Sequence, residues 1–443
     1  MPGLEVLLDP PATTGLLALA DAEARFSRAT ATVGAERVEL GHSRAGRPLT
    51  LHRLGSGERR SFWYAGPHAN EPVGVSTIVE LAERLAARPE VLRGDIGFDL
   101  LLCLDPDSYV LNENWFGPEI DPGTYYRGLY RPAMNEFPDW DFPVEYGTPP
   151  ATLRRESTLP EGRALRAGVD LSRPLVLNAL HNAELGGVHF CVLGERGGLA
   201  ARLSALPRRF GLPREEAMLD DPEALPLAAG VFPIPDLTGV YGTVPASGHD
   251  DPVGHLLGGS AAAWCGRYGT VSMVPEIPYW SVAEERPAGA ATMGDLARAT
   301  GRELAAFADW LAGFVRAHPA ALPTGDPRAR ATLDAPARLA GLAAAFIAWA
   351  DTDAARTLGT PDAAARYEVM LSVCLPLRYR GMLLAAVTAA GAPATTIGLA
   401  EEAFEAGMAA LAKTPLTAHP LPTLVDIQLA AGVLATDCAA AAA

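Results

Sequence analysis

The spacing of apolar positions changes several times along the first three hundred residues. Residues 1–30 have a helical period, and the stretch 38–54 alternates apolar and polar side chains on either side of a turn, which is typical of a hairpin. Continuous apolar runs, which favour strands covered on both faces, follow at residues 61–65, 98–104, 174–180 and 269–274. A helical period over 72–87 separates the first two runs. Strand, helix and strand in this order predict an α/β domain.

The last part of the chain has a different pattern. Residues 319–443 are rich in alanine, with helical periods and no strand candidate, and Pro376 is expected to kink or end one of the helices. We therefore predict an α/β domain at 1–318 and a helical domain at 319–443, which packs on the first domain or on a second subunit of a homo-oligomer. Residues 105–165 have few periodic segments, and long irregular stretches of this kind are usually functional loops.

Composition and charge exclude several classes of protein. Apolar residues make up 49% of the 443 positions, which is enough to form a large core and excludes disorder of the whole chain. The 36 Lys and Arg against 52 Asp and Glu give a formal charge of −16. This acidity argues against a nucleic acid as partner and against docking on an anionic membrane surface, because both need clustered cations.

The N-terminus and the cysteines indicate where the protein works. Glu5 and Asp9 interrupt the stretch in which a secretory signal would be uniformly apolar. The longest apolar runs, such as 339–350, are interrupted by polar residues or shorter than the ~18 residues that a membrane span needs. Five dispersed cysteines without a C-x-x-C pair are typical of reduced thiols in a core. A cytoplasmic protein is therefore expected.

Histidines and glutamates follow three of the predicted strands. His68 and Glu71 follow the first strand, His181 follows the third and Glu276 follows the fourth. The carboxyl ends of strands in an α/β sheet open into one crevice, so these side chains are expected to converge. Two imidazoles and a carboxylate are a common catalytic set for Zn²⁺, and a further glutamate can deprotonate the water on the fourth position.

The spacing H-x-x-E occurs twice, so it does not by itself identify the third ligand. Glu71 precedes Pro72 at a predicted helix start, which holds it at the exit of a strand, whereas Glu184 lies in a looser, glycine-rich segment. We therefore expect His68, Glu71 and His181 to be the metal ligands, and Glu184 to have a supporting or structural role.

Several motifs together resemble the zinc carboxypeptidase (carboxypeptidase A-like) family. Residues 42–49, H-S-R-A-G-R-P-L, and residues 64–74, which contain H-A-N-E, resemble the family's G-x-S-x-x-G-R-P-L turn and its G-x-H-x-x-E motif. Further similar segments follow in the family's order at residues 105–108, 129–132, 160–165 and 245–248. The match covers about residues 38–280 and leaves the C-terminal helices outside.

The resemblance implies a fold and an activity. The fold would be a mixed, mostly parallel sheet flanked by helices, here with a C-terminal all-helical appendage. A single zinc would be held by His68, Glu71 and His181. Arg131 would polarise the scissile carbonyl, and Glu276 would take a proton from water and pass it to the leaving amine. The implied activity is that of a metallocarboxypeptidase.

The sequence departs from the family where the substrate is bound. Asp139 and Trp140 stand where the family has the Asn-Arg pair that holds the substrate's terminal carboxylate. Arg127, Arg154 or Arg155 could replace the missing cation, because a planar guanidinium suits a carboxylate.

The family also has a tyrosine about twenty residues before the catalytic glutamate, a second hydrogen-bond donor to the leaving group besides Glu276, and this tyrosine has no clear counterpart here. His255 or Tyr241 could take its place.

Three functions remain open on this basis. The first is a zinc carboxypeptidase that acts on small or modified peptides. The second is a deacylase of N-acyl amino acids, because the short loop 68–71 also resembles the aspartoacylase-like branch. The third is a binding protein with an inactive site, which the loss of the Asn-Arg pair would explain.

Overall fold

A mixed eight-stranded sheet forms the centre of the protein. The computed structural model describes residues 3–146, 153–218, 224–235, 258–282, 292–356 and 366–442. The strand order is β1-β2-β4-β3-β7-β10-β8-β9. The strands are β1 (Glu36–His42), β2 (Pro48–Leu54), β3 (Arg59–Tyr64), β4 (Ile96–Leu101), β7 (Val176–Ala179), β8 (His189–Leu193), β9 (Val231–Pro233) and β10 (Val271–Glu276).

Most neighbouring strands run parallel. β4, β3, β7 and β10 form a parallel block, and β8 also runs parallel to β9. The β1–β2, β2–β4 and β10–β8 pairs are antiparallel. The expected mixed, mostly parallel sheet flanked by helices is therefore confirmed, and all four predicted buried strands lie in the parallel block.

Helices cover both faces of the sheet. The side chains of one strand alternate between these faces, so each strand contributes residues to the core on both sides. In β3, Phe62 and Tyr64 pack in the cluster that contains α5 and α9 residues. Trp63 and the following Ala65 pack in the opposite cluster, which contains residues of α1, α2 and α15. The helices are α1 (Leu19–Thr32), α2 (Val73–Ala87), α5 (Pro160–Ser172), α9 (Ala261–Cys265) and α15 (Leu421–Ala442).

The stretch 105–165, predicted to be irregular, holds mostly short elements before α5. They include α3 (Pro106–Tyr109), α4 (Pro122–Gly128), β5 (Val144–Tyr146) and β6 (Leu153–Arg155). Two further short helices, α6 (Leu199–Ser204) and α7 (Leu206–Arg209), follow β8.

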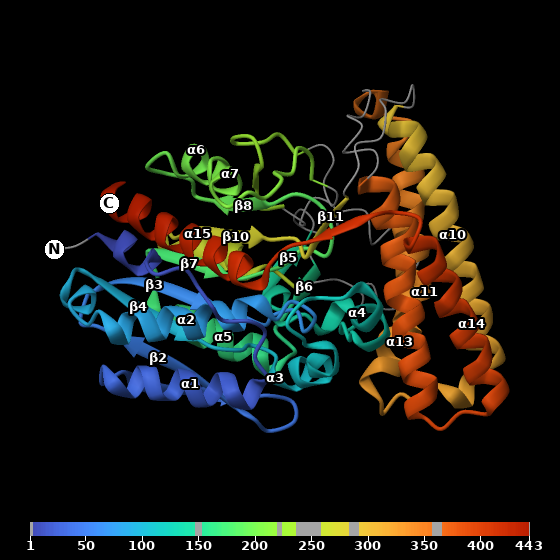
Figure 1. Ribbon diagram of the computed structural model, residues 1–443, viewed down its shortest axis with the longest axis horizontal. Helices are drawn as coiled ribbons and strands as arrows, with labels where there is room; N and C mark the ends of the chain where they lie inside the picture. The colour runs from blue at the N-terminus through green and yellow to red at the C-terminus, as the bar shows by residue number, and fades with distance from the viewer. Residues whose placement is uncertain are drawn as a thin grey trace.

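A layer of long helices lies beside the part that contains the sheet (Figure 1). We call it the helical layer; it consists of α10 (Met293–Ala317), α11 (Pro327–Trp349), α13 (Leu375–Ala389) and α14 (Ala394–Leu411). A π-helical turn, Met370–Cys374, leads into α13, and Pro376 lies in the first turn of that helix. The helix therefore does not end at Pro376, and the irregular π-helical turn directly precedes the proline, whose ring does not fit a regular α-helical interior.

The last helix, α15, leaves the helical layer and packs on the sheet next to α2 (Figure 1). The hydroxyls of Ser61 on β3 and Thr436 on α15 are 2.8 Å apart. A strand that the sequence pattern did not predict, β12 (Leu416–Ala418), precedes α15 and pairs with β11 (Trp280–Val282). The division at residue 318 stays a prediction, and α15 belongs to the core of the sheet.

Close packing of α15 on β3 predicts a large effect of one methyl group. A Cβ atom on Gly432 would overlap the ring of Trp63, which is fully buried. We expect Gly432→Ala to lower the free energy of unfolding by at least about 2 kcal/mol. Gly341→Ala on α11 is the matched control, because its Cβ would meet open space and should stabilise the helix by up to about 1 kcal/mol. Urea unfolding of both variants measures the difference.

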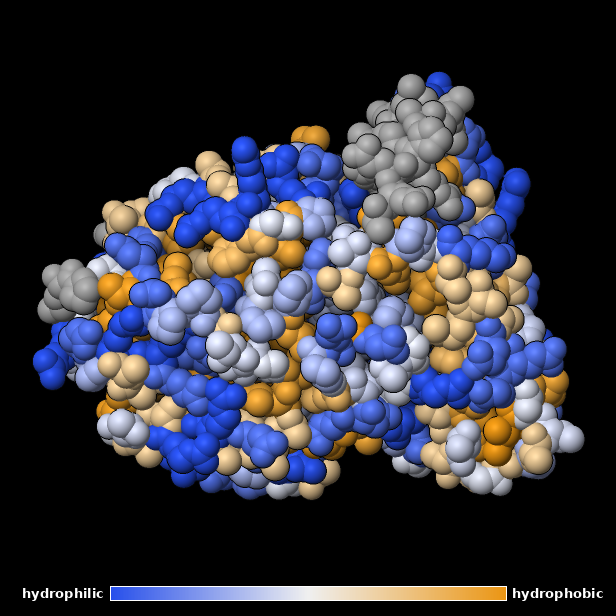
Figure 2. All heavy atoms as spheres, viewed as in Figure 1, coloured by the Kyte–Doolittle hydropathy of each residue, from blue (hydrophilic) through white to orange (hydrophobic). Residues whose placement is uncertain are grey.

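Three described helices are long and apolar enough to cross a membrane, by length and composition only: α11, Arg366–Ala389 and α15. The expectation that no apolar segment reaches this length was wrong, because single polar residues within alanine-rich helices hardly lower the mean hydropathy. In the fold, 72% of the apolar window of α15 is buried, against 33% for α11. Figure 2 shows apolar and hydrophilic side chains intermingled on the visible face of the helical layer.

A buried histidine in β2 makes the stability depend on pH. His52 is 5% exposed, and its Nδ1 lies 2.9 Å from the Thr30 hydroxyl. Burial, together with the charge of Arg37, lowers the pKa of His52 from 6.5 to about 4. The unfolded chain therefore takes up this proton first, and the free energy of unfolding should fall as the pH drops from about 6.5 to about 4. His52→Gln should flatten that fall in urea titrations; an unchanged slope would contradict it.

Candidate metal centre

The carboxyl ends of three adjacent parallel strands lie at one edge of the sheet. His68 and Glu71 follow β3, His181 follows β7, and Glu276 ends β10. His181 and Glu276 also form an isolated parallel bridge beyond the regular strands. The structure thus brings together the four residues that the sequence pattern placed at the ends of three strands.

The loop between β3 and α2 fixes His68 and Glu71 on the same side. The backbone N–H of Glu71 donates to the carbonyl of His68 at 3.1 Å, which closes a tight turn. Pro72 follows as the N-cap of α2, so Glu71 lies where the positive end of the helix dipole favours a carboxylate.

The Glu71 carboxylate lies between the two imidazoles. Its Oε1 is 2.9 Å from Nδ1 of His68, and its Oε2 is 3.0 Å from Nδ1 of His181. All three side chains are less than 10% exposed. The backbone N–H of Asn182 also donates to Oε2 at 3.2 Å.

Asp139 faces the opposite edges of the same imidazoles. Its Oδ2 is 3.4 Å from Nε2 of His181, and its Oδ1 is 3.7 Å from Nε2 of His68. Among the residues that the structure describes, neither His68 Nε2 nor Asp139 Oδ1 has a hydrogen-bond partner. His68, Asp139 and His181 offer ligand atoms within 4.8 Å of one another and could hold a metal ion. Each imidazole therefore has one carboxylate at each of its two nitrogens.

The charges in the centre shift the pKa values of its two histidines in opposite directions. Burial lowers the pKa of His68, and the nearby Arg131 guanidinium lowers it further. Burial alone would raise the pKa of Glu71, but the two imidazoles and Arg131 hold it well below its ordinary value. Glu71 is therefore ionised and His68 neutral at neutral pH, the states in which such groups ligate a metal. Burial alone would lower the pKa of His181, but the carboxylates of Asp139 and Glu71 raise it well above its ordinary value, so a metal ion would have to displace a proton from His181.

Arg131 lies in the loop after α4 and reaches into the centre. Its Nη1 donates to Glu71 Oε1 at 2.7 Å and to Asn70 Oδ1 at 2.9 Å, and its Nη2 is 3.3 Å from Nδ1 of His68. The guanidinium also lies over the ring of Phe137, with its carbon 4.9 Å from the ring centroid. Arg131 is thus held by several contacts.

Glu276 faces the centre from β10. Its Oε1 is 4.0 Å from Nδ1 of His181, and its side chain is 25% exposed. Arg131 and Glu276 both lie on the Nδ1 side of the imidazoles, which is the side of Glu71. A cation that can bind an oxyanion and a carboxylate that can accept a proton therefore flank the same edge.

Glu184, expected to be a supporting residue, lies outside this group. Its carboxylate accepts hydrogen bonds from the hydroxyls of Tyr125 and Tyr126, at 2.7 and 3.1 Å, and from Nε of Arg378 on α13 at 3.0 Å. The preference for Glu71 over Glu184 in the sequence agrees with these contacts.

The candidates for substrate binding are distributed more widely. Asp139 lies behind the imidazoles, and Trp140 follows it in a half-buried position with its carbonyl hydrogen-bonded to the backbone of Gly258. The structure places Arg127 against α14, where it pairs with Glu401, rather than at the centre. His255 and Tyr241 lie outside the described residues.

The other two arginine candidates already have acidic partners. Arg155 is buried and pairs with Asp141 at 2.9 Å, and Arg154 is exposed and pairs with Glu156. The replacement of the family's Asn-Arg pair by any of these arginines stays a prediction.

The sequence reasoning missed contacts that surround the centre. Tyr279, just beyond β10, donates its hydroxyl to the carbonyl of Asn70 at 2.7 Å, and Tyr125 accepts from the Asn70 amide at 2.8 Å. The signal in the sequence that could have identified Asn70 is its position between His68 and Glu71. The tyrosines resembled ordinary core residues.

No family model matches this sequence, and no curated protein matches it significantly. Solved structures with a similar fold include a candidate metallopeptidase from Shewanella amazonensis, with 15% identity and a TM-score of 0.39 over 59% of this chain and 84% of that one. A metallo-carboxypeptidase from Burkholderia cenocepacia is 17% identical, with a TM-score of 0.35 over 59% of this chain and 60% of its own.

A third structure, the murein-tripeptide amidase MpaA from Escherichia coli O157, is 18% identical, with a TM-score of 0.27 over 56% of this chain and 86% of its own. All these likenesses are distant.

Proposed function

We propose that this protein is a zinc-dependent hydrolase of amide bonds, most simply a metallocarboxypeptidase that releases a C-terminal amino acid from a small or modified peptide. One observation supports this above all: the Glu71 carboxylate joins the Nδ1 atoms of His68 and His181, and Glu276 and Arg131 lie on that same side.

The donor set suits zinc. Two imidazoles and one carboxylate leave a fourth tetrahedral position open for water. Zinc with bonds of about 2.0–2.1 Å places its ligand atoms about 3.3 Å apart. The contacts of 2.9 and 3.0 Å from Glu71 to the two Nδ1 atoms are close to that separation. Asp139 would then orient both rings through their Nε2 atoms.

The chain's own residues account for the remaining chemistry. Bound zinc supplies a Lewis acid that lowers the pKa of water toward about 7. The Glu276 carboxylate accepts the proton of the attacking water and returns it to the leaving nitrogen. The Arg131 guanidinium donates hydrogen bonds to the oxygen on which negative charge develops.

A metal analysis and a substrate panel test the proposal. Purified protein is analysed for zinc, and mass spectrometry follows its reaction with short peptides and N-acyl amino acids. Release of a C-terminal amino acid from a peptide supports the carboxypeptidase, whereas hydrolysis of N-acyl amino acids alone supports the deacylase. Absence of both zinc binding and hydrolysis after zinc addition would favour an inactive binding protein.

A further inference from the structure

We propose that Glu184 and Arg378 are positioning residues for the candidate metal centre, so that the helical layer fixes the orientation of Arg131. The proposal rests on the function proposed above, and it assigns a role to helices that lie outside the family resemblance. A continuous series of hydrogen bonds connects Arg378 and Glu184 with Arg131 through Tyr125 and Asn70. We call this series the relay.

Each step of the relay has a normal hydrogen-bond length. Arg378 donates to Glu184 Oε1 from Nε at 3.0 Å, and the Tyr125 hydroxyl donates to the same oxygen at 2.7 Å. The Asn70 amide nitrogen donates to the Tyr125 oxygen at 2.8 Å, and Arg131 Nη1 donates to the Asn70 amide oxygen at 2.9 Å. Asn70, Tyr125 and Glu184 are all less than 5% exposed.

The chemistry of its members gives the relay a single direction. An ionised carboxylate only accepts hydrogen bonds, so Tyr125 must direct its one proton to Glu184. The Tyr125 oxygen is then an acceptor, which requires the nitrogen of the Asn70 amide. The oxygen of that amide is thereby turned toward Arg131, which has donors only. The carboxylate of Glu184 thus determines that the oxygen of the Asn70 amide, and not its nitrogen, faces Arg131.

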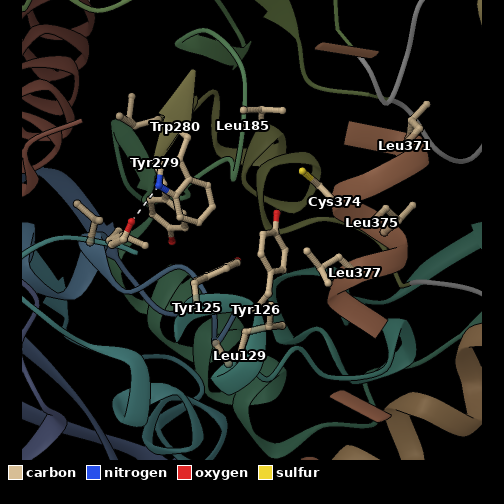
Figure 3. Close-up of a cluster of buried hydrophobic side chains, with 14 of the residues drawn as sticks. Tyr125, Tyr126, Leu129, Leu185, Tyr279, Trp280, Leu371, Cys374, Leu375 and Leu377 are labelled. Atoms are coloured by element: carbon tan, nitrogen blue, oxygen red, sulfur yellow. Dashed lines mark hydrogen bonds between the residues drawn. The ribbon is translucent and has the colours of Figure 1, made fainter. Parts of the chain in front are cut away.

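Arg378 holds the far end of the relay in place. Its side chain is 12% exposed, and its Nη2 lies 2.9 Å from Glu184 Oε1. It lies in the first turn of α13, directly after the π-helical turn Met370–Cys374. Figure 3 shows Tyr126 between Tyr279 and Trp280 on one side and Cys374 of the π-helical turn and Leu377 of α13 on the other, with Tyr125 beside Tyr126.

A matched pair of tyrosines allows a sharp test. Both Tyr125 and Tyr126 donate to Glu184, but among the described contacts only the Tyr125 hydroxyl also reaches Asn70. We expect Tyr125→Phe to lower kcat/KM about tenfold, because the amide nitrogen of Asn70 loses its hydrogen-bond acceptor. Tyr126→Phe should cost similar thermal stability and little of kcat/KM.

A double-mutant cycle with Arg131→Ala separates positioning from general damage. If Tyr125 and Arg378 act through Arg131, then Tyr125→Phe and Arg378→Lys should lower kcat/KM no further once Arg131 is absent. Arg378→Lys keeps the charge and should fold, but loses the Nε contact. Additive losses in the double variants would overturn the proposal.

Zinc affinity, measured by chelator competition, gives a readout that does not depend on turnover. Arg131 donates to an oxygen of Glu71, so Arg131→Ala should change zinc affinity by about tenfold. Tyr125→Phe should shift the zinc affinity in the same direction by less, and not at all without Arg131.

Zinc binding without hydrolysis would contradict the proposed function, while this cycle still tests the relay. If no zinc binds, the same cycle is measured by urea unfolding, where additivity again overturns the relay.

Discussion

Replacing Glu276 with glutamine should lower kcat by about a thousandfold while zinc stays bound. The side chain lies 4.0 Å from Nδ1 of His181 and is 25% exposed, so it can reach both water and substrate. Glutamine keeps the shape but cannot accept a proton, and proton transfer by a positioned group contributes about 10²–10⁴-fold to a rate.

The measurement combines turnover with metal analysis of the same preparation. Glu216→Gln is a suitable control, because Glu216 is an exposed glutamate that pairs with Arg214 on the surface. It should leave both zinc content and kcat unchanged. Turnover that survives in Glu276→Gln would show that another group is the base.

Glu71→Gln should weaken zinc binding by more than about a thousandfold, and Asp139→Asn by about 10–100-fold. Glu71 contacts the Nδ1 atoms, on the side where Glu276 and Arg131 lie, and we therefore regard it as a direct ligand. Asp139 contacts the Nε2 atoms, where it would orient the rings.

Both variants change a carboxylate to an amide of the same size, so each is the other's control. Competition with a chromophoric chelator gives the two dissociation constants. If Asp139→Asn loses zinc more strongly than Glu71→Gln, the ion binds at the Nε2 side, together with Asp139. Such a result would reverse the roles of the two carboxylates.

Much of the sheet could be predicted because its signals are local. Four continuous apolar runs and one alternating hairpin gave six of the eight strands, and a helical period gave α2. The pattern did not predict β8 and β9, which lie at one edge of the sheet. It also missed β12, which forms only by pairing with β11 far away in the chain.

The candidate site was predicted in part for the same reason. His68, His181 and Glu276 follow recognisable strands, and parallel strands must end at one edge. Asp139 was expected to take part in substrate binding because of its place in a motif. Its position behind the imidazoles depends on how residues 137–140 fold over the centre, and the spacing of the sequence contains no signal for that.

The sequence by itself determined the order of strands and helices and which donors lie at strand ends, since periodicity and chain order are properties of neighbouring residues. Only the tertiary structure decided which carboxylate meets which edge of the imidazoles, and that Arg378 connects to Arg131 through the relay. These contacts join segments that are 60 to almost 200 residues apart. Their formation depends on the packing of whole helices against the sheet, which no short pattern encodes.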